Sequence, residues 1–175
     1  MDEIVRDLEL NEIDLVVGDA VEGFNPTHDL CRYLINAAVR IYAEKAKTKI
    51  DNFDFLLDGP PDYCPPELDQ EGIRIRLSDT EFERKMAAVR DYPDIAVDIE
   101  QAIKQHGESA FRTECLRPVK DTSSYTGWKG DGPHYERYGK AKVRNGMYPE
   151  AITFQGHLRP LADFLASYPG SAGVE

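Results

Sequence analysis

Apolar positions in the first part of the chain follow two patterns, a helical spacing and then a short unbroken run. Residues 2–10 place apolar side chains on one helical face and predict a short helix. The run IDLVV, residues 13–17, is almost continuously apolar and ends in Gly18 and Asp19. Such a run is typical of a strand buried on both faces of a parallel sheet.

A long amphipathic stretch follows this predicted strand. Asn25 is a favoured N-cap residue and Pro26 suits the first helical position, so a helix is expected to begin there and to fade near Lys47. FDFLL, residues 53–57, predicts the next strand. Strand, helix and strand together predict a βαβ unit with a right-handed crossover.

The middle of the chain is punctuated by proline, glycine and capping residues. Residues 58–72 contain four prolines and predict a loop. Ser78 and Glu81 have the spacing of a capping box at a helix start. Pro93 is expected to break this helical region, and Gly107 stands where a helix C-terminus favours glycine.

The last third of the chain predicts one strand, one loop and one helix. Residues 111–119 alternate apolar and polar positions and predict a strand at an edge of the sheet. Residues 120–134 are polar and rich in glycine and predict a mobile loop, and Pro149 is expected to open a last helix that ends before a frayed tail after Tyr168. The predicted fold class is α/β, with a partial parallel sheet flanked by helices, a C-terminal helix and a single domain over residues 1–175.

Net charge, hydropathy and cysteine content indicate which partners and which cellular compartment to expect. The formal net charge is −11, from 21 basic and 32 acidic residues, and no basic patch stands out, which argues against nucleic-acid binding. No apolar run approaches the roughly 20 residues that span a bilayer. The three cysteines Cys31, Cys64 and Cys115 form no C-x-x-C pair, so we expect free thiols in a reducing cytoplasm.

Several polar and ionisable residues lie between the first predicted strand and the long predicted helix. Ligands of open parallel sheets bind beyond the carboxyl ends of strands, where Asp19, Glu22, Asn25 and His28 follow one another. His28 and Cys31 are three apart and could share a helix face, and zinc accepts both ligand types. The alternative is structural: Asp19 and Asn25 could tie down the loop and cap the helix, and Cys31 could be packing material.

Two longer segments resemble the PIG-L (LmbE-like) deacetylases. LVVGDAVEGFNPTHDLCRYLINAAV resembles their second motif region, and PHYERYGKAKVRNGMYPEAITFQGHLRPLADFL resembles the C-terminal segment of some members, so the resemblance covers roughly residues 10–168. It implies a Rossmann-like fold and a zinc-dependent hydrolase that removes acyl groups from amino-sugar conjugates. The third zinc ligand of the family is the second histidine of an H-P-x-H motif, which here makes His28 the metal ligand. Asn25 replaces the first histidine, and it could donate a hydrogen bond to an oxyanion but could not act as a general acid.

The chain departs from the family in a second way, because the A-H-P-D-D-E motif that supplies two metal ligands and the general base is absent. We therefore expect an N-terminally incomplete domain, inactive alone, that associates with itself or with a complementing N-terminal half. Asp19, Glu22 and His157 are the candidate substrate-binding residues, and an amino-sugar or other acylated small molecule is the expected substrate. The alternatives are a non-catalytic sugar-binding or interaction module, or a structural α/β fragment without a ligand.

Overall fold

Four strands form one open mixed sheet in the computed structural model, which describes residues 1–120 and 132–170. The strands lie in the order β1-β2-β4-β3 and include one parallel pair. With the helices of the described residues, they give the α/β fold that the sequence predicts. The strands are β1 (Leu15–Asp19), β2 (Asp51–Phe55), β3 (Ile73–Arg76) and β4 (Thr113–Pro118), and the helices are α1 (Asp2–Leu10), α2 (Pro26–Ala46), α3 (Asp79–Arg90), α4 (Ala96–His106), α5 (His134–Arg144) and α6 (Arg159–Ser167).

The chain divides into two compact units by its internal packing. One unit is Met1–Phe53 with Val119–Glu175, and the other is Asp54–Pro118. The first unit contains β1, α2 and the candidate residues named above, so its local structure decides what they can do. Within the described residues, no helix combines the length and the apolar composition that crossing a membrane requires.

The first unit is built around the predicted strand–helix–strand segment. The amide N–H of Asp51 donates to the carbonyl of Asp14 at 2.8 Å, so β1 and β2 begin side by side and run parallel. Helix α2 connects the two strands, which confirms the βαβ order. The observed strands are shifted from the predicted ones by about two residues, which is the usual uncertainty of a strand end.

Strand β1 is not buried on both faces, and this part of the prediction is wrong. Leu15 and Val17 lie on one face and are 44% and 37% exposed, while Val16 packs against the core between α1 and α2. The reason is that α1 and α2 pack against the face of β1 that carries Val16, so the opposite face with Leu15 and Val17 stays partly exposed.

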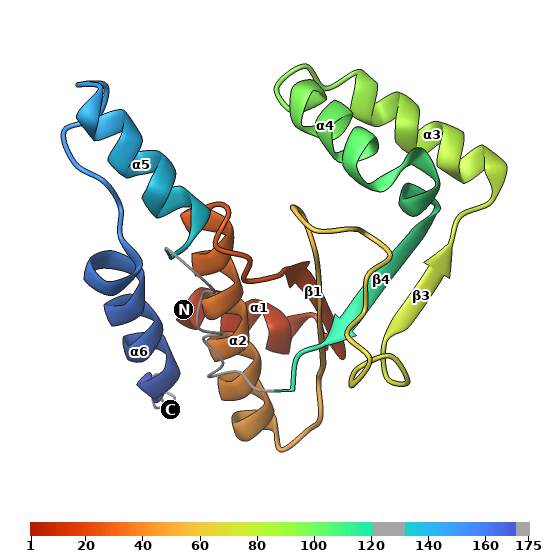
Figure 1. Ribbon diagram of the computed structural model, residues 1–175. Helices are drawn as coiled ribbons and strands as arrows, with labels where there is room; N and C mark the ends of the chain where they lie inside the picture. The colour runs from red at the N-terminus through yellow and green to blue at the C-terminus, as the bar shows by residue number, and fades with distance from the viewer. Residues whose placement is uncertain (121–131, 171–175) are drawn as a thin grey trace. The chain divides into compact units, whose positions relative to one another are not determined.

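Helix α2 carries most of the core of the first unit. In Figure 1 it lies between α1 and α6, and it packs against both. Two apolar clusters line these contacts, and their buried α2 residues run from Tyr33 to Tyr42. The first cluster consists of Val5, Ala38, Val39, Ile41, Tyr42 and Ile50, and the second of Tyr33, Ala37 and Leu165.

The C-terminal part of the first unit differs from the prediction. Pro149 does not open a helix: the chain passes from α5 through residues without regular structure to a single π-helical turn, Phe154–Leu158, before α6 begins. Ala151 packs so closely on Gly139 of α5 that a Cβ on this glycine would lie 3.2 Å from the Cβ of Ala151. Helix α5 was not predicted, and residues 121–131 of the predicted mobile loop lie outside the described residues.

The second unit pairs β3 with β4 and adds α3 and α4. Ser78 accepts a hydrogen bond from the backbone of Glu81, whose side chain accepts one from the Ser78 backbone, so the predicted capping box is confirmed. Gly107 follows α4 with a φ of 82°, a left-handed value that favours glycine. Strand β3 was not predicted, and it makes β4 an interior strand rather than the expected edge strand.

Candidate functional site

The end of β1 and the start of α2 are joined by a short loop, and helix capping defines its far side. The side-chain oxygen of Asn25 accepts a hydrogen bond from the N–H of Thr27 at 2.9 Å, and Pro26 occupies the first turn. The predicted helix start is confirmed. The side-chain oxygen of Asn25 therefore accepts the capping hydrogen bond. The two N–H groups of the same side chain can still donate hydrogen bonds to a ligand.

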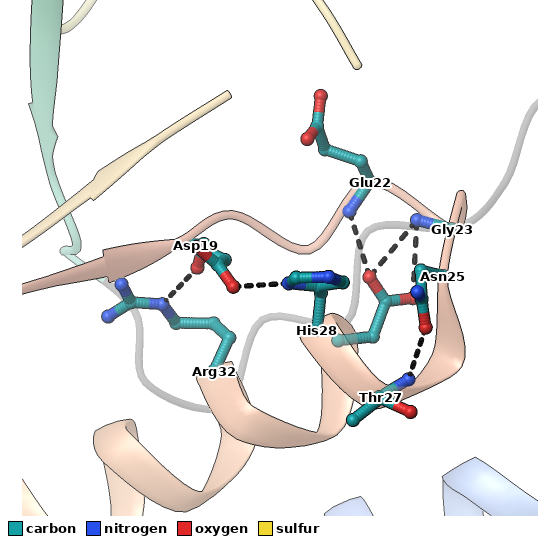
Figure 2. A network of polar contacts seen from close by, with 8 residues as sticks. Asp19, Glu22, Gly23, Asn25, Thr27, His28 and Arg32 are labelled. Atoms are coloured by element: carbon teal, nitrogen blue, oxygen red, sulfur yellow. Dashed lines mark hydrogen bonds and ion pairs between the residues drawn. The ribbon is translucent and has the colours of Figure 1, made fainter. Parts of the chain in front are cut away.

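The carboxylate of Asp19 and the imidazole of His28 form a hydrogen-bonded pair across this loop. Asp19 ends β1 and His28 lies in the first turn of α2, and Figure 2 shows Nδ1 of His28 facing a carboxylate oxygen of Asp19. An ionised carboxylate only accepts, so the neutral imidazole carries its proton on Nδ1 and its lone pair on Nε2. The His28 side chain is 44% exposed, and this nitrogen can act as a proton acceptor or as a metal ligand.

Asp29, in the first turn of α2, holds the loop between β1 and α2 in place, a role that the sequence did not predict. Its side chain is 1% exposed and accepts hydrogen bonds from the N–H groups of Glu22 at 3.1 Å and Gly23 at 3.2 Å. Gly23 has a φ of 70°, in the left-handed region that glycine adopts without strain. Burial raises the pKa of Asp29 to about 6, although the hydrogen bonds from Gly23 and Glu22 oppose the rise. The sequence signal for this role is an acidic residue in the first turn of a helix that follows a loop containing glycine.

Arg32 is a second buried group that the sequence analysis missed. It is 1% exposed and donates from Nε to the carbonyl of Asp19 at 2.6 Å. The same guanidinium reaches the side-chain oxygen of Asn52 at 2.9 Å and the carbonyl of Phe53 at 3.0 Å. One side chain of α2 therefore holds the end of β1 and the middle of β2 together.

Two sequence features indicate this buried arginine in retrospect. His28, Arg32 and Asn36 follow one another at intervals of four, which makes a polar stripe along a helix that is otherwise apolar on its inner side. Gly18 gives the guanidinium room, because a Cβ on this glycine would lie 2.8 Å from Nη2 of Arg32. Gly18 lies inside the observed strand β1, and a glycine within a strand often marks such a close approach.

Three other candidate residues, Glu22, His157 and Cys31, are not part of the Asp19–His28 hydrogen bond. In Figure 2 the carboxylate of Glu22 points away from the ring of His28. Nδ1 of His157 contacts the backbone N–H of Thr153 at 3.1 Å and its hydroxyl at 3.2 Å, so these contacts belong to the π-helical turn. Cys31 is an exposed free thiol.

A complete zinc site is not formed by the residues of the structure. The described part of the chain brings no three histidine, cysteine, aspartate or glutamate side chains together as a group that could hold a metal. The Asp19–His28 pair by itself fits one ligand, because a metal-bound histidine commonly donates its other N–H to a carboxylate. These residues therefore match one third of the usual protein ligand set of catalytic zinc.

The loop is also fastened to helix α5. The N–H of Tyr135 donates to the carbonyl of Gly23 at 3.3 Å, and the ring of Phe24 stacks on the ring of His134 with centroids 4.8 Å apart. Tyr138 continues this stack one turn further along α5. The loop that carries the site is therefore held by α2 on one side and by α5 on the other.

Comparisons of the chain with protein-family models, with curated proteins and with solved structures give no match. The resemblance to the PIG-L deacetylases therefore stays a prediction.

Proposed function

We propose that this chain contributes one histidine to the active site of a hydrolase that removes acyl groups from amino-sugar conjugates, as the resemblance to the PIG-L deacetylases implies. The observation that carries the proposal is the Asp19–His28 pair at the carboxyl end of a parallel strand. Ligands of open α/β sheets bind at such ends, and the proposed fold is Rossmann-like. The proposed compartment is the cytoplasm, where thiols are ordinarily reduced and disulfides, when they form, are usually transient.

Each residue of the pair has a defined task in this proposal. Asp19 keeps the proton of His28 on Nδ1 and so presents the lone pair of Nε2 to a metal. Zinc bound there would lower the pKa of its water to about 7 and polarise the acyl carbonyl. Asn25 would donate from its amide nitrogen to the oxyanion, while its oxygen keeps the helix cap. Asp19, Glu22 and His157 remain the proposed substrate-binding residues.

In this proposal the remaining metal ligands come from a partner, either a second copy or a complementing N-terminal half. The edge position of β1 supports association, because the strand presents the apolar side chains of Leu15 and Val17. Replacing Val17 by lysine is expected to reduce association, measured as the concentration dependence of the sedimentation coefficient. Val97→Lys is the matched control, because Val97 is also exposed, at 65%, but lies on α4. A wild-type chain that stays monomeric at all concentrations and unfolds sharply and reversibly would argue against the partner.

The proposed role of His28 can be tested without an activity assay. Long-range ¹H–¹⁵N spectra of the labelled protein distinguish protonated from unprotonated ring nitrogens, and His28→Gln assigns the signals of His28. We expect a protonated Nδ1 in the wild type and a mixture of tautomers in Asp19→Asn. Added zinc should shift Nε2 of His28 in the wild type, and the His157→Gln variant should behave like the wild type.

Two results would overturn parts of this proposal. If millimolar zinc leaves His28 unchanged while the spectra show a folded protein, His28 is not a metal ligand. If metal analysis finds one tightly bound zinc per chain in the isolated monomer, the ligand set is complete and the need for a partner is wrong.

A second function, a non-catalytic sugar-binding module, is favoured by one observation. The side-chain oxygen of Asn25 and the carboxylate of Asp29 are both committed to holding the loop, so the loop keeps its shape without any metal. This alternative predicts saturable binding of N-acetylglucosamine by calorimetry, unchanged by a chelator. Hydrolysis of an N-acetylglucosamine conjugate that stops on adding the chelator would exclude it.

A further inference from the structure

Two buried thiols lie next to each other in the second unit, away from the residues discussed above. Cys64 belongs to the loop between β2 and β3, and Cys115 lies on β4. Both cysteines are free and buried, with 9% and 1% exposure, and the Cys64 thiol is one of the groups that raise the pKa of Cys115. Such a pair needs only the loss of two hydrogens to become a disulfide.

The backbone around the two thiols places the loop on β4. The N–H of Cys115 donates to the carbonyl of Pro61 at 2.9 Å. A Cβ built on Gly72 would lie 3.0 Å from the sulfur of Cys64 and 3.4 Å from the carbonyl oxygen of Leu116. The absence of a side chain at Gly72 therefore lets the sulfur of Cys64 pack against the backbone just before β3, at a position that also adjoins Leu116 of β4.

Arg74 fastens the same loop on both sides of Cys64. It is the cross-strand partner of Cys115 in the β3–β4 ladder. Its guanidinium donates to the carbonyl of Asp62 at 2.8 Å and pairs with the carboxylate of Asp69. Asp62 lies two residues before Cys64, and Asp69 lies five residues after it. Both are thus tied to β3, the strand that pairs with β4 at Cys115.

We propose that Cys64 and Cys115 are a disulfide-forming pair that reacts with a low-molecular-weight disulfide such as glutathione disulfide and then pins the loop to β4. In the first step the thiolate of Cys64 attacks glutathione disulfide, forms a mixed disulfide and releases one glutathione. In the second step the thiolate of Cys115 attacks the sulfur of Cys64 and releases the second glutathione. The two protein thiols are oxidised, glutathione disulfide is reduced to two glutathiones, and the two protein protons pass to them.

The surroundings of the two thiols set the order and the speed of these steps. Cys64 is the more exposed thiol and lies on a loop, so the reagent reaches it first. Burial, together with the neighbouring Cys64 thiol, raises the pKa of Cys115 to about 11. The second step depends on the Cys115 thiolate, so its rate should rise about tenfold per pH unit between pH 7 and 9.

The test uses the Cys31→Ser variant of the 175-residue chain, in which Cys64 and Cys115 are the remaining thiols. The protein is incubated with glutathione disulfide, quenched with acid, denatured, alkylated with iodoacetamide and weighed by mass spectrometry. We expect a product about 2 Da lighter than the reduced chain and without alkylation, which dithiothreitol converts back. The matched Cys31→Ser, Cys115→Ala variant should stop at the mixed disulfide, and circular dichroism reports whether each variant is folded.

Two outcomes would overturn the proposal. In the first, both thiols of the folded Cys31→Ser protein remain fully alkylated after prolonged incubation with glutathione disulfide at pH 9. In the second, the mixed disulfide on Cys64 accumulates and never yields the lighter species. Either result would mean that the two sulfurs are packed together but cannot adopt the geometry of a disulfide.

Discussion

The guanidinium of Arg32 donates from Nε to the backbone carbonyl of Asp19 at 2.6 Å, from a side chain that is 1% exposed. Asp19 in turn binds His28, so a buried arginine positions the residue that orients the exposed imidazole. The same arginine is bonded to Asn52 and to the carbonyl of Phe53. The structure of the candidate site and the stability of the first unit therefore depend on one side chain.

Replacing Arg32 by methionine should destabilise the protein strongly. The substitution keeps much of the apolar stem but leaves the partly buried carbonyl of Asp19 and the buried carbonyl of Phe53 without this donor. Each unsatisfied buried group costs about 1–3 kcal/mol, so the free energy of unfolding in urea should fall by about 3 kcal/mol. Arg90→Met is the matched control, because Arg90 is 67% exposed, and it should change the free energy of unfolding by less than about 0.5 kcal/mol. Equal losses in both variants would contradict the role of Arg32.

Gly18→Ala should be destabilising for a related reason. The added methyl group would lie 2.8 Å from Nη2 of Arg32 and 2.8 Å from Cδ1 of Ile35, so both side chains would have to move. Overpacking of this kind costs about 1–3 kcal/mol. The double variant with Arg32→Met separates the two contacts: the alanine should cost less there than in the wild type, and strictly additive losses would show that Arg32 is not the obstacle.

Asp29 should give the protein a distinctive dependence of stability on pH. Its pKa is raised to about 6 in the folded state, mainly by burial, so the folded protein takes up this proton before the unfolded chain does. The free energy of unfolding should therefore rise as the pH falls from 7 through 6 toward 4, by about 3 kcal/mol from this group.

Asp29→Asn isolates this contribution from the other carboxylates. Asparagine keeps an oxygen for the N–H of Gly23 but has no proton to gain over this range. The difference in free energy of unfolding, wild type minus variant, should be larger at pH 4.5 than at pH 7. A difference that stays constant with pH, or that shrinks toward pH 4.5, would contradict the burial of an ionised Asp29.

The capping box of α3 offers a local test in the second unit. Ser78→Ala removes the acceptor for the N–H of Glu81 and should lower the free energy of unfolding by about 1 kcal/mol. The hydrogen bonds from Ser78 lower the pKa of Glu81, so their stabilising effect should be lost as the pH falls through that lowered value. Thr80→Ala, an exposed neighbour in the same turn, is the control and should be nearly neutral. A similar loss in both variants would argue against the cap.

The features that the sequence predicted well are local ones. The caps at Asn25 and Ser78 close hydrogen bonds over two or three residues, so a few side chains are enough to predict them. Apolar residues recur at helical spacing along most of α2, so the sequence predicted this helix nearly to its last residue. Helix α5, HYERYGKAKVR, has few apolar positions, and β3 has four residues that are all exposed, so neither shows a clear pattern of burial.

The sequence by itself determined where α2 and α3 start, which residues cap them, and that His28 follows a strand end within one short loop. Only the tertiary structure decided that β1 lies at an edge, that Asp29 and Arg32 are buried, and that His157 is engaged in its own turn. Burial is the physical reason. Arg32 meets Asn52 and Phe53 across about 20 residues of chain, and no local pattern reports a contact that forms only when α2 packs against both strands.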